Sequence, residues 1–192
     1  MKSKRNQQDF EAKQQQLRQL EILQGQGFLQ LYYYDESGFS LTSALPYAWQ
    51  KKGKTIEIPA AKGQRINVAG LINRQGDFHY QTHTGYMGSK EVISLLDRFC
   101  EKLQQKTVVV VDNAPTHRSK AFMEKVKRWQ EQDLYIFFLP AYSPELNKIE
   151  MLWKKIKYQW LEFDAYTSWQ NLQQHLNQVL DNISLKYILN FG

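Results

Sequence analysis

The amino-acid sequence predicts an α/β fold in which helices cover a mixed sheet. Segments rich in β-branched and aromatic residues fill the region 28–85, and from Ser89 the apolar period changes from two residues to about 3.6. Four valines, Val108–Val111, then stand between two segments with the helical period, as expected for a strand that is buried on both faces. Strands that are joined through helices in this way are typical of α/β proteins.

The composition fits one compact domain. The chain has 192 residues, and its hydrophobic content of 42% is far from the composition of disordered chains. The formal net charge of +6 favours an anionic partner, although proteins that bind no nucleic acid are often as basic. Cys100 is the only cysteine, which excludes a disulfide within the chain and a cysteine-rich zinc site. No segment reaches membrane-spanning length, so we expect a cytoplasmic protein without membrane contact.

The first element is a helix over residues 7–26. This segment is rich in glutamine, and Phe10, Leu17 and Leu20 give it only a thin apolar stripe. The pattern predicts a connecting helix rather than an element of the core.

A meander of strands follows. Residues 28–41 predict a strand, a tight turn at Asp-Glu-Ser-Gly and a second strand, which places Asp35 at the end of the first strand. The second strand is expected to continue through 41–49. A third strand is predicted at 65–74 and a short fourth at 77–85.

The second half of the chain alternates helices and strands. A helix is expected from Ser89 as its N-cap, a second helix from about His117, and a third from about Asn147. A buried strand at 134–140 follows the second helix. The last helix is expected to begin at a capping box over 167–170.

Three acidic residues are candidates for a shared site. A right-handed crossover would place the valine strand beside the first strand, which would bring Asp35 and Asp112 to the same edge of the sheet. Close carboxylates repel, so they either share a proton or bind a cation, and Glu150 on the third helix would favour the cation as a third acid. Oxygen ligands without cysteine favour Mg²⁺ or Mn²⁺, and two such ions would suit an in-line displacement at phosphorus. On pattern alone, each aspartate is also explained as a turn residue at a strand end, and both interpretations stay open.

Basic residues near these acids are candidate contacts to nucleic acid. Two of the lysines follow Glu150 by four and seven positions and would extend along the same helical edge, where a phosphate backbone could run. An exposed Glu150–Lys154 pair worth about 0.3 to 0.5 kcal/mol is the alternative for this helix, and a solvated or capping turn is the alternative for the others. The candidates are Lys51, Lys52, Lys54, His117, Lys154 and Lys157.

Three blocks of sequence together resemble the transposase domain of the mariner-like superfamily, in particular its bacterial insertion-sequence branch. The blocks are YYYDESGFSL, VVVVDNAPTHRS and LPAYSPELNKIEMLWKKIK, and the resemblance extends over about residues 28–165. It implies an RNase H-like fold with a mixed five-stranded sheet flanked by helices. It also implies a triad of Asp35, Asp112 and Glu150 that binds two Mg²⁺ ions, with Mn²⁺ as an alternative. One departure is Lys148, where the family pattern usually has proline.

The resemblance implies a function in DNA transposition. Such a domain cleaves DNA strands at the ends of an element and transfers them into target DNA, so the expected partners are terminal inverted repeats, target DNA and a second copy of the chain in a synaptic complex. We expect residues 1–27 to be the connecting helix and residues 28–192 the catalytic domain. The helix-turn-helix module that family members usually carry is missing before residue 28, which suggests an upstream reading frame that encodes such a partner.

Two alternatives to the transposase remain open. One is a truncated, non-catalytic fragment that inhibits or partners a full-length transposase. The other is a different RNase H-like nuclease, which would cut DNA without strand transfer.

Overall fold

The computed structural model describes residues 5–42, 52–53 and 63–191, and it contains one mixed five-stranded sheet. The strand order is β3-β2-β1-β4-β5. β1 is antiparallel to β2 and parallel to β4, β2 is antiparallel to β3, and β4 is parallel to β5. The strands are β1 (Gln30–Ser40), β2 (Arg65–Asn73), β3 (Phe78–Thr84), β4 (Thr107–Val111) and β5 (Leu134–Phe138). The predicted α/β class and the five-stranded mixed sheet are therefore confirmed.

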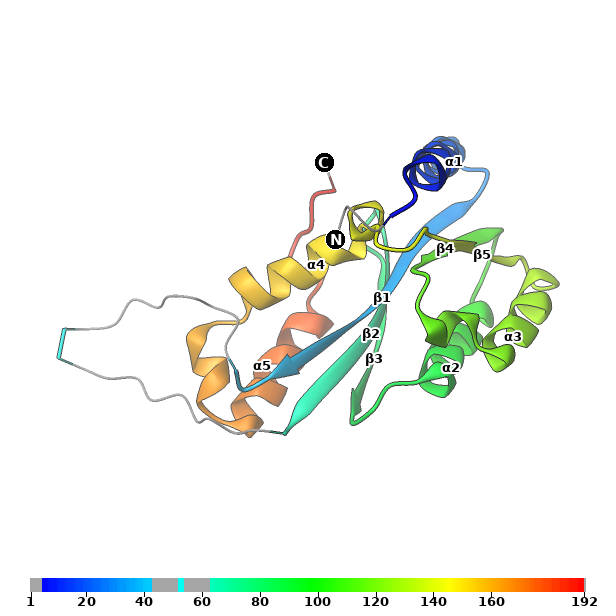
Figure 1. The fold of residues 1–192 in the computed structure, drawn as a ribbon. Coiled ribbons are helices and arrows are strands. Elements are labelled where there is room, and N and C mark those ends of the chain that lie inside the picture. The colour runs from blue at the N-terminus through cyan, green and yellow to red at the C-terminus, as the bar shows by residue number, and fades with distance from the viewer. Residues whose placement is uncertain (1–4, 43–51, 54–62, 192) are drawn as a thin grey trace.

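Helices cover both faces of this sheet (Figure 1). α4 and α5 lie on one side, and α2 and α3 lie on the other. Because β4 lies between these two layers, all five of its residues are buried. Two cores result, one on each face, as alternate side chains of β1 and β4 enter opposite layers. The helices are α1 (Gln7–Gly25), α2 (Ser89–Cys100), α3 (Lys120–Gln130), α4 (Ile149–Lys155) and α5 (Trp169–Asp181).

β1 is one continuous strand, so the predicted turn at Asp-Glu-Ser-Gly was wrong. Asp35 pairs with Gly70 of β2, and the ladder continues without a break through Gly38. Tertiary contacts outweigh the local turn propensity of this segment. β2 supplies a ladder partner for each residue, and the alternate positions Ser37 and Phe39 are buried. The second strand that was expected at 41–49 lies, beyond residue 42, outside the described residues.

The helices begin close to the expected positions, with different caps. α2 is capped by Gly88 instead of Ser89, since the side chain of Glu91 accepts a hydrogen bond from the Gly88 amide. The expected helix from His117 is a short 3₁₀ turn, Pro115–Arg118, and α3 starts at Lys120. α5 is capped by Ser168 instead of by a box starting at Thr167.

α1 packs on the same face of the sheet as α4 and α5. Phe10 and Leu17 are buried in the core on that face, together with Leu31 and Tyr33 of β1. The thin apolar stripe of α1 therefore contributes to the core, which a helix that only connected two parts of a chain would not do. None of the described helices is both long enough and apolar enough to cross a membrane.

Candidate active site

The three predicted acids line one cavity of about 370 Å³ at the edge of the sheet. Asp35 comes from β1, Asp112 directly follows β4, and Glu150 lies in the first turn of α4. The segments that follow β4 and β5 complete the walls of this cavity. The other lining residues are Asn113, Ala114, Leu139, Pro140, Ala141, Tyr142, Ser143, Pro144 and Asn147.

The parallel pairing of β1 with β4 brings the two aspartates together. Tyr33 is the last residue of β1 in register with β4, and its partner is Val110. Asp35 and Asp112 each stand two residues beyond this pair, so their side chains leave the sheet on the same face. Asp35 therefore lies inside β1 rather than at its end, but at the point where β1 runs past its β4 neighbour.

Asn147 fixes the segment that carries Glu150 against β1. Its side-chain Nδ2 donates a hydrogen bond of 2.8 Å to the backbone oxygen of Tyr34, the residue before Asp35. The backbone N–H of Glu150 donates to the backbone oxygen of Asn147 at 3.1 Å. These two bonds tie the start of α4 to the strand position next to Asp35.

A glycine allows α4 to approach the sheet closely. A Cβ atom on Gly70, the β2 partner of Asp35, would lie 2.9 Å from the Trp153 ring and 2.9 Å from the Phe78 ring. Real Cβ atoms do not approach other atoms so closely, so only glycine lets Trp153 of α4 sit over this position. The depth at which α4 packs therefore depends on Gly70.

Burial and negative charge raise the pKa of Asp35. Burial is the largest cause, the charges of Glu36, Glu150 and Asp112 add to it, and the pKa reaches about 8. The acids are thus close enough to disfavour each other's ionised form. Such repulsion is relieved either by a proton on Asp35 or by a cation in the cavity.

Asp112 is held by a buried histidine. Nδ1 of His117 lies 2.6 Å from Oδ1 of Asp112, and the Ala114 N–H donates to the same oxygen at 3.0 Å. Burial alone would raise the pKa of Asp112, but these two hydrogen bonds hold it below its ordinary value. Burial would likewise lower the pKa of His117, yet the contacts with Asp112 and Glu36 raise it to about 9. Asp112 is therefore ionised and His117 is protonated at neutral pH.

The donor atoms around the cavity fit a hard divalent cation. They are carboxylate oxygens, and the buried side chain of Asn147 adds an Oδ1 atom that has no hydrogen-bond partner in the described structure. Within the described ranges, no three side chains of His, Cys, Asp or Glu are gathered closely enough to enclose an ion. Oδ1 of Asp112 is engaged by His117 and by the Ala114 amide.

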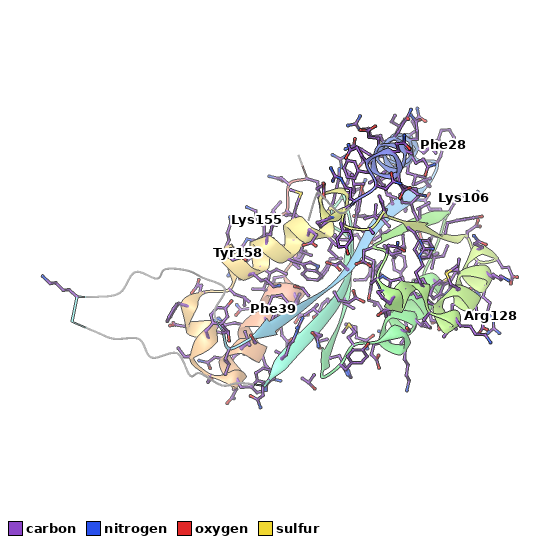
Figure 2. All side chains as sticks on the ribbon, viewed as in Figure 1. Phe28, Phe39, Lys106, Arg128, Lys155 and Tyr158 are labelled. Carbon is purple, nitrogen blue, oxygen red and sulfur yellow. The ribbon has the colours of Figure 1, made fainter. Side chains whose placement is uncertain are left out.

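The predicted cations differ in their positions. Lys154 is exposed on α4, and Lys157 lies half-buried in the π-helical turn Ile156–Trp160 that continues it. Figure 2 labels Lys155 and Tyr158 on this same helical segment, whose outer surface thus combines cations with an exposed tyrosine. The six described ion pairs do not include Glu150 with Lys154, so that alternative does not account for Glu150.

Lys157 is close to the acids of the cavity. Burial and the charge of Arg65 lower the pKa of Lys157, whereas the charges of Glu150 and Asp35 act in the opposite direction. Of the three lysines around Gly53, Lys52 is exposed, and Lys51 and Lys54 lie outside the described residues.

His117 is buried in this structure. Its side chain is only 1% exposed and packs against the rings of Tyr34 and Phe122. Its two ring nitrogens are engaged by Asp112 and Glu36, and the expected contact with nucleic acid stays a prediction that this burial does not favour.

Sequence reasoning missed the roles of Asn147, Glu36 and the buried ring of His117. Asn147 stands three residues before Glu150, where a capping residue would be expected, and this spacing was the available signal. Nothing in the local pattern indicates that Glu36 and Asp112 share the two nitrogens of one imidazole, since this contact depends on the pairing of β1 with β4.

The comparisons with known proteins give the family and the fold of the chain. A family model described as DDE superfamily endonuclease matches residues 30–183. No curated protein sequence gave a match. The family match includes all three acids of the cavity and confirms a DDE superfamily endonuclease domain. The transposase assignment and the bacterial branch stay predictions.

Solved structures share the fold. The Mos1 strand transfer complex gives a TM-score of 0.62 at 14% identity, covering 92% of this chain and 55% of that chain. The Mos1 mariner paired-end complex with Mn gives 0.61 at 15% identity, covering 92% and 56%. A chain of the simian T-cell lymphotropic virus intasome gives 0.55 at 14% identity, covering 84% and 50%. The fold is therefore RNase H-like, and the chain spans about half the length of the Mos1 chains that it matches.

Proposed function

The chain belongs to the DDE superfamily endonuclease family, and from this premise we propose that it is the catalytic domain of a DNA transposase. In this proposal it cleaves DNA strands at the ends of a mobile element and joins them to target DNA. The observation that carries the proposal is the single cavity to which β1, β4 and α4 bring Asp35, Asp112 and Glu150. If the three acids only closed turns or capped helices, they would have no reason to face one cavity from three separate elements.

We assign Asp35, Asp112 and Glu150 as the ligands of divalent cations, with Mg²⁺ as the principal ion and Mn²⁺ as an alternative. A pair of such ions, when bound, activates the attacking oxygen and stabilises the leaving oxygen of a phosphodiester. Asp112 is already ionised, because His117 and the Ala114 amide stabilise its charge. Asp35 carries a proton at neutral pH and releases it when a cation binds.

We propose that the outer surface of α4 guides the DNA backbone to the cavity. Lys154 and Lys157 lie one and two turns beyond Glu150 on the same helical segment, and Lys157 is close enough to the acids for their charges to affect its pKa. Lys51, Lys52 and Lys54 remain proposed contacts. The Mos1 structures are described as paired-end and strand transfer complexes, and on that likeness we propose that two copies of this chain act on paired element ends and a target duplex.

The test uses the 192-residue chain and three single substitutions. Asp112→Asn and Glu150→Gln should abolish Mg²⁺-dependent nicking of a supercoiled plasmid and the joining of a pre-cut oligonucleotide to target DNA. Glu145→Gln is the matched control, because Glu145 belongs to the same motif but does not line the cavity, and the amide oxygen of glutamine can still accept the hydrogen bond from Arg5. Direct titration with Mn²⁺ should show loss of binding in the first two variants alone.

The outcomes separate the alternatives. Nicking without joining would assign the chain to another RNase H-like nuclease. Mn²⁺ binding without nicking or joining would support a non-catalytic fragment that partners a longer transposase. Unchanged activity in Asp112→Asn would remove the triad from the mechanism.

A further inference from the structure

One carboxylate of α1 touches both elements that carry Asp35 and Glu150. The hydroxyl of Tyr33 donates a hydrogen bond of 2.8 Å to Oε1 of Glu21, and Nζ of Lys148 lies 2.8 Å from the same oxygen. Tyr33 precedes Asp35 by two residues on β1, and Lys148 precedes Glu150 by two residues at the start of α4. A single side chain of α1 thus bridges the strand and the helix.

The surroundings of Glu21 make this bridge firm. Tyr33 is fully buried, and the side chains of Glu21 and Lys148 are only 19% and 22% exposed. Burial would raise the pKa of Glu21, but the contacts with Lys148 and Tyr33 and the charge of Arg74 hold it below its ordinary value. Glu21 is therefore an anion at neutral pH in a place where solvent screens its interactions weakly.

A nearby anion stabilises the charge of Lys148. It occupies the N-cap position of α4, where the positive end of the helix dipole disfavours a cation. The resemblance to the mariner-like superfamily leads one to expect proline at this position, which would fix the backbone by its own ring. Here the side chain of Lys148 instead forms an ion pair with Glu21, outside the helix.

Two further contacts hold α1 on the protein: an ion pair near its N-terminus and the packing of its apolar face on the sheet. Arg5, two residues before the start of α1, pairs through its guanidinium with Glu145, in the loop that leads to α4. Phe10 and Leu17 bury the apolar face of the helix on the sheet. A rigidly held α1 can therefore transmit its position to both ends of the bridge.

We propose that Glu21 is a positioning residue, which sets the separation of Asp35 and Glu150 by holding Tyr33 and Lys148 on one carboxylate. In this proposal α1 helps to position the ligands of the cation site instead of serving only as a connecting helix. This inference rests on the proposed function, because it assigns Glu21 a role in the binding of a cation by the acids.

The experiment compares Glu21→Ala and Lys148→Met with the wild-type chain. Both variants should weaken Mn²⁺ binding by about 3- to 10-fold, measured by titration without DNA. Residues that orient metal ligands without touching the metal commonly affect metal affinity to this extent or more. Hydrogen exchange in the metal-free protein should become faster in α4 and stay unchanged in α2 and α3, on the other face of the sheet. Glu11→Ala is the matched control, because Glu11 is an exposed acid of α1 whose side chain accepts a hydrogen bond from Gln7 of the same helix.

A charge exchange separates the ion pair of Glu21 from its hydrogen bond with Tyr33. The double variant Glu21→Lys/Lys148→Glu restores an ion pair between α1 and α4 but offers the Tyr33 hydroxyl no acceptor, so it should recover only part of the Mn²⁺ affinity that Glu21→Ala loses. If Glu21→Ala does not fold, Lys148→Met and the double variant still decide the question.

Two results would overturn the inference. One is wild-type affinity for Mn²⁺ in Glu21→Ala, and the other is a uniform increase of exchange over the whole sheet, which would indicate general destabilisation. Asp112→Asn, measured in parallel, separates this failure from a failure of the proposed function. If Asp112→Asn loses Mn²⁺ binding while Glu21→Ala keeps it, only the positioning role is wrong; if Asp112→Asn keeps it, the proposed cation site is wrong, and the positioning role falls with it.

Discussion

Nδ1 of His117 lies 2.6 Å from Oδ1 of Asp112 in the interior of the protein. This contact joins a residue of the 3₁₀ turn after β4 to the acid that ends the strand. Because Glu36 of β1 approaches the other ring nitrogen at 3.3 Å, the imidazole links the two neighbouring parallel strands just below the cavity. The orientation of Asp112 thus depends on a buried histidine.

We predict that His117 titrates at a pKa of about 9, well above the ordinary value of a histidine. A group whose pKa is raised by folding stabilises the protein fully below its unfolded pKa of 6.5, and this stabilisation is lost as the pH rises through 9. NMR spectra of the four histidines, recorded between pH 5 and about 10, should show one ring whose midpoint of titration lies at a much higher pH than those of the others. Titration of every ring near its ordinary value would contradict the Asp112–His117–Glu36 arrangement.

We predict that Asp35→Asn stabilises the metal-free protein at neutral pH while it removes activity. The pKa of Asp35 is raised by folding to about 8, so the unfolded chain releases this proton more readily and stability falls as the pH rises from about 4 to 8. Removal of the ionisable group should increase the free energy of unfolding at pH 7.5 by about 1 to 3 kcal/mol.

Urea denaturation measures this effect. The exposed residue Glu131 gives the control, since Glu131→Gln should change the free energy of unfolding by less than about 0.5 kcal/mol. A loss of stability in Asp35→Asn at pH 7.5 would mean that the ionised carboxylate is well accommodated without a cation.

The parts of the fold that depend on long apolar patterns were predictable from the sequence. Val108–Val111 indicate a strand buried on both faces without any knowledge of its neighbours, and the handedness of crossovers then places this strand beside β1. The convergence of Asp35 and Asp112 follows from these two steps alone. Glu150 was harder, because its nearness to β1 depends on Asn147 and Gly70, which act through contacts across the fold.

The errors have a common physical origin in tertiary contacts. Residues Asp35–Gly38 carry a strong local turn signal, but β2 provides a ladder partner for every one of them. His117 looks like a polar turn residue, but the rings of Tyr34 and Phe122 enclose it once β1 and α3 are in place. Local propensity cannot indicate either outcome, since the decisive neighbours are distant in the sequence.

We predict that Gly70→Ala both destabilises the protein and lowers its activity. The added Cβ would lie 2.9 Å from the rings of Trp153 and Phe78, so α4 must move outward and take Glu150 away from Asp35. The free energy of unfolding should fall by about 1 to 3 kcal/mol, the usual cost of overpacking a core.

Gly25→Ala is the control for this substitution. Gly25 is the last residue of α1, and nothing lies within 4 Å of the position that its Cβ would take. Thermal denaturation of Gly25→Ala should show no loss of stability or a gain of up to about 1 kcal/mol. Wild-type nicking rates in Gly70→Ala would show that α4 tolerates displacement and would contradict the role given to this glycine.

We predict that Lys157 contacts the DNA backbone rather than the bases. The charges of Glu150 and Asp35 act on the pKa of Lys157, so its ammonium group lies near the acids that a scissile phosphate would approach. Lys157→Gln should weaken binding to every DNA sequence alike and reduce the slope of log affinity against log salt concentration by about 1, as expected when one phosphate contact is lost. Lys120→Gln is the control, because Lys120 is an exposed cation at the start of α3, on the other face of the sheet from α4. A slope that stays unchanged in Lys157→Gln, or that falls equally in Lys120→Gln, would show that the DNA does not follow α4, since only a cation along its path should change the number of ions released.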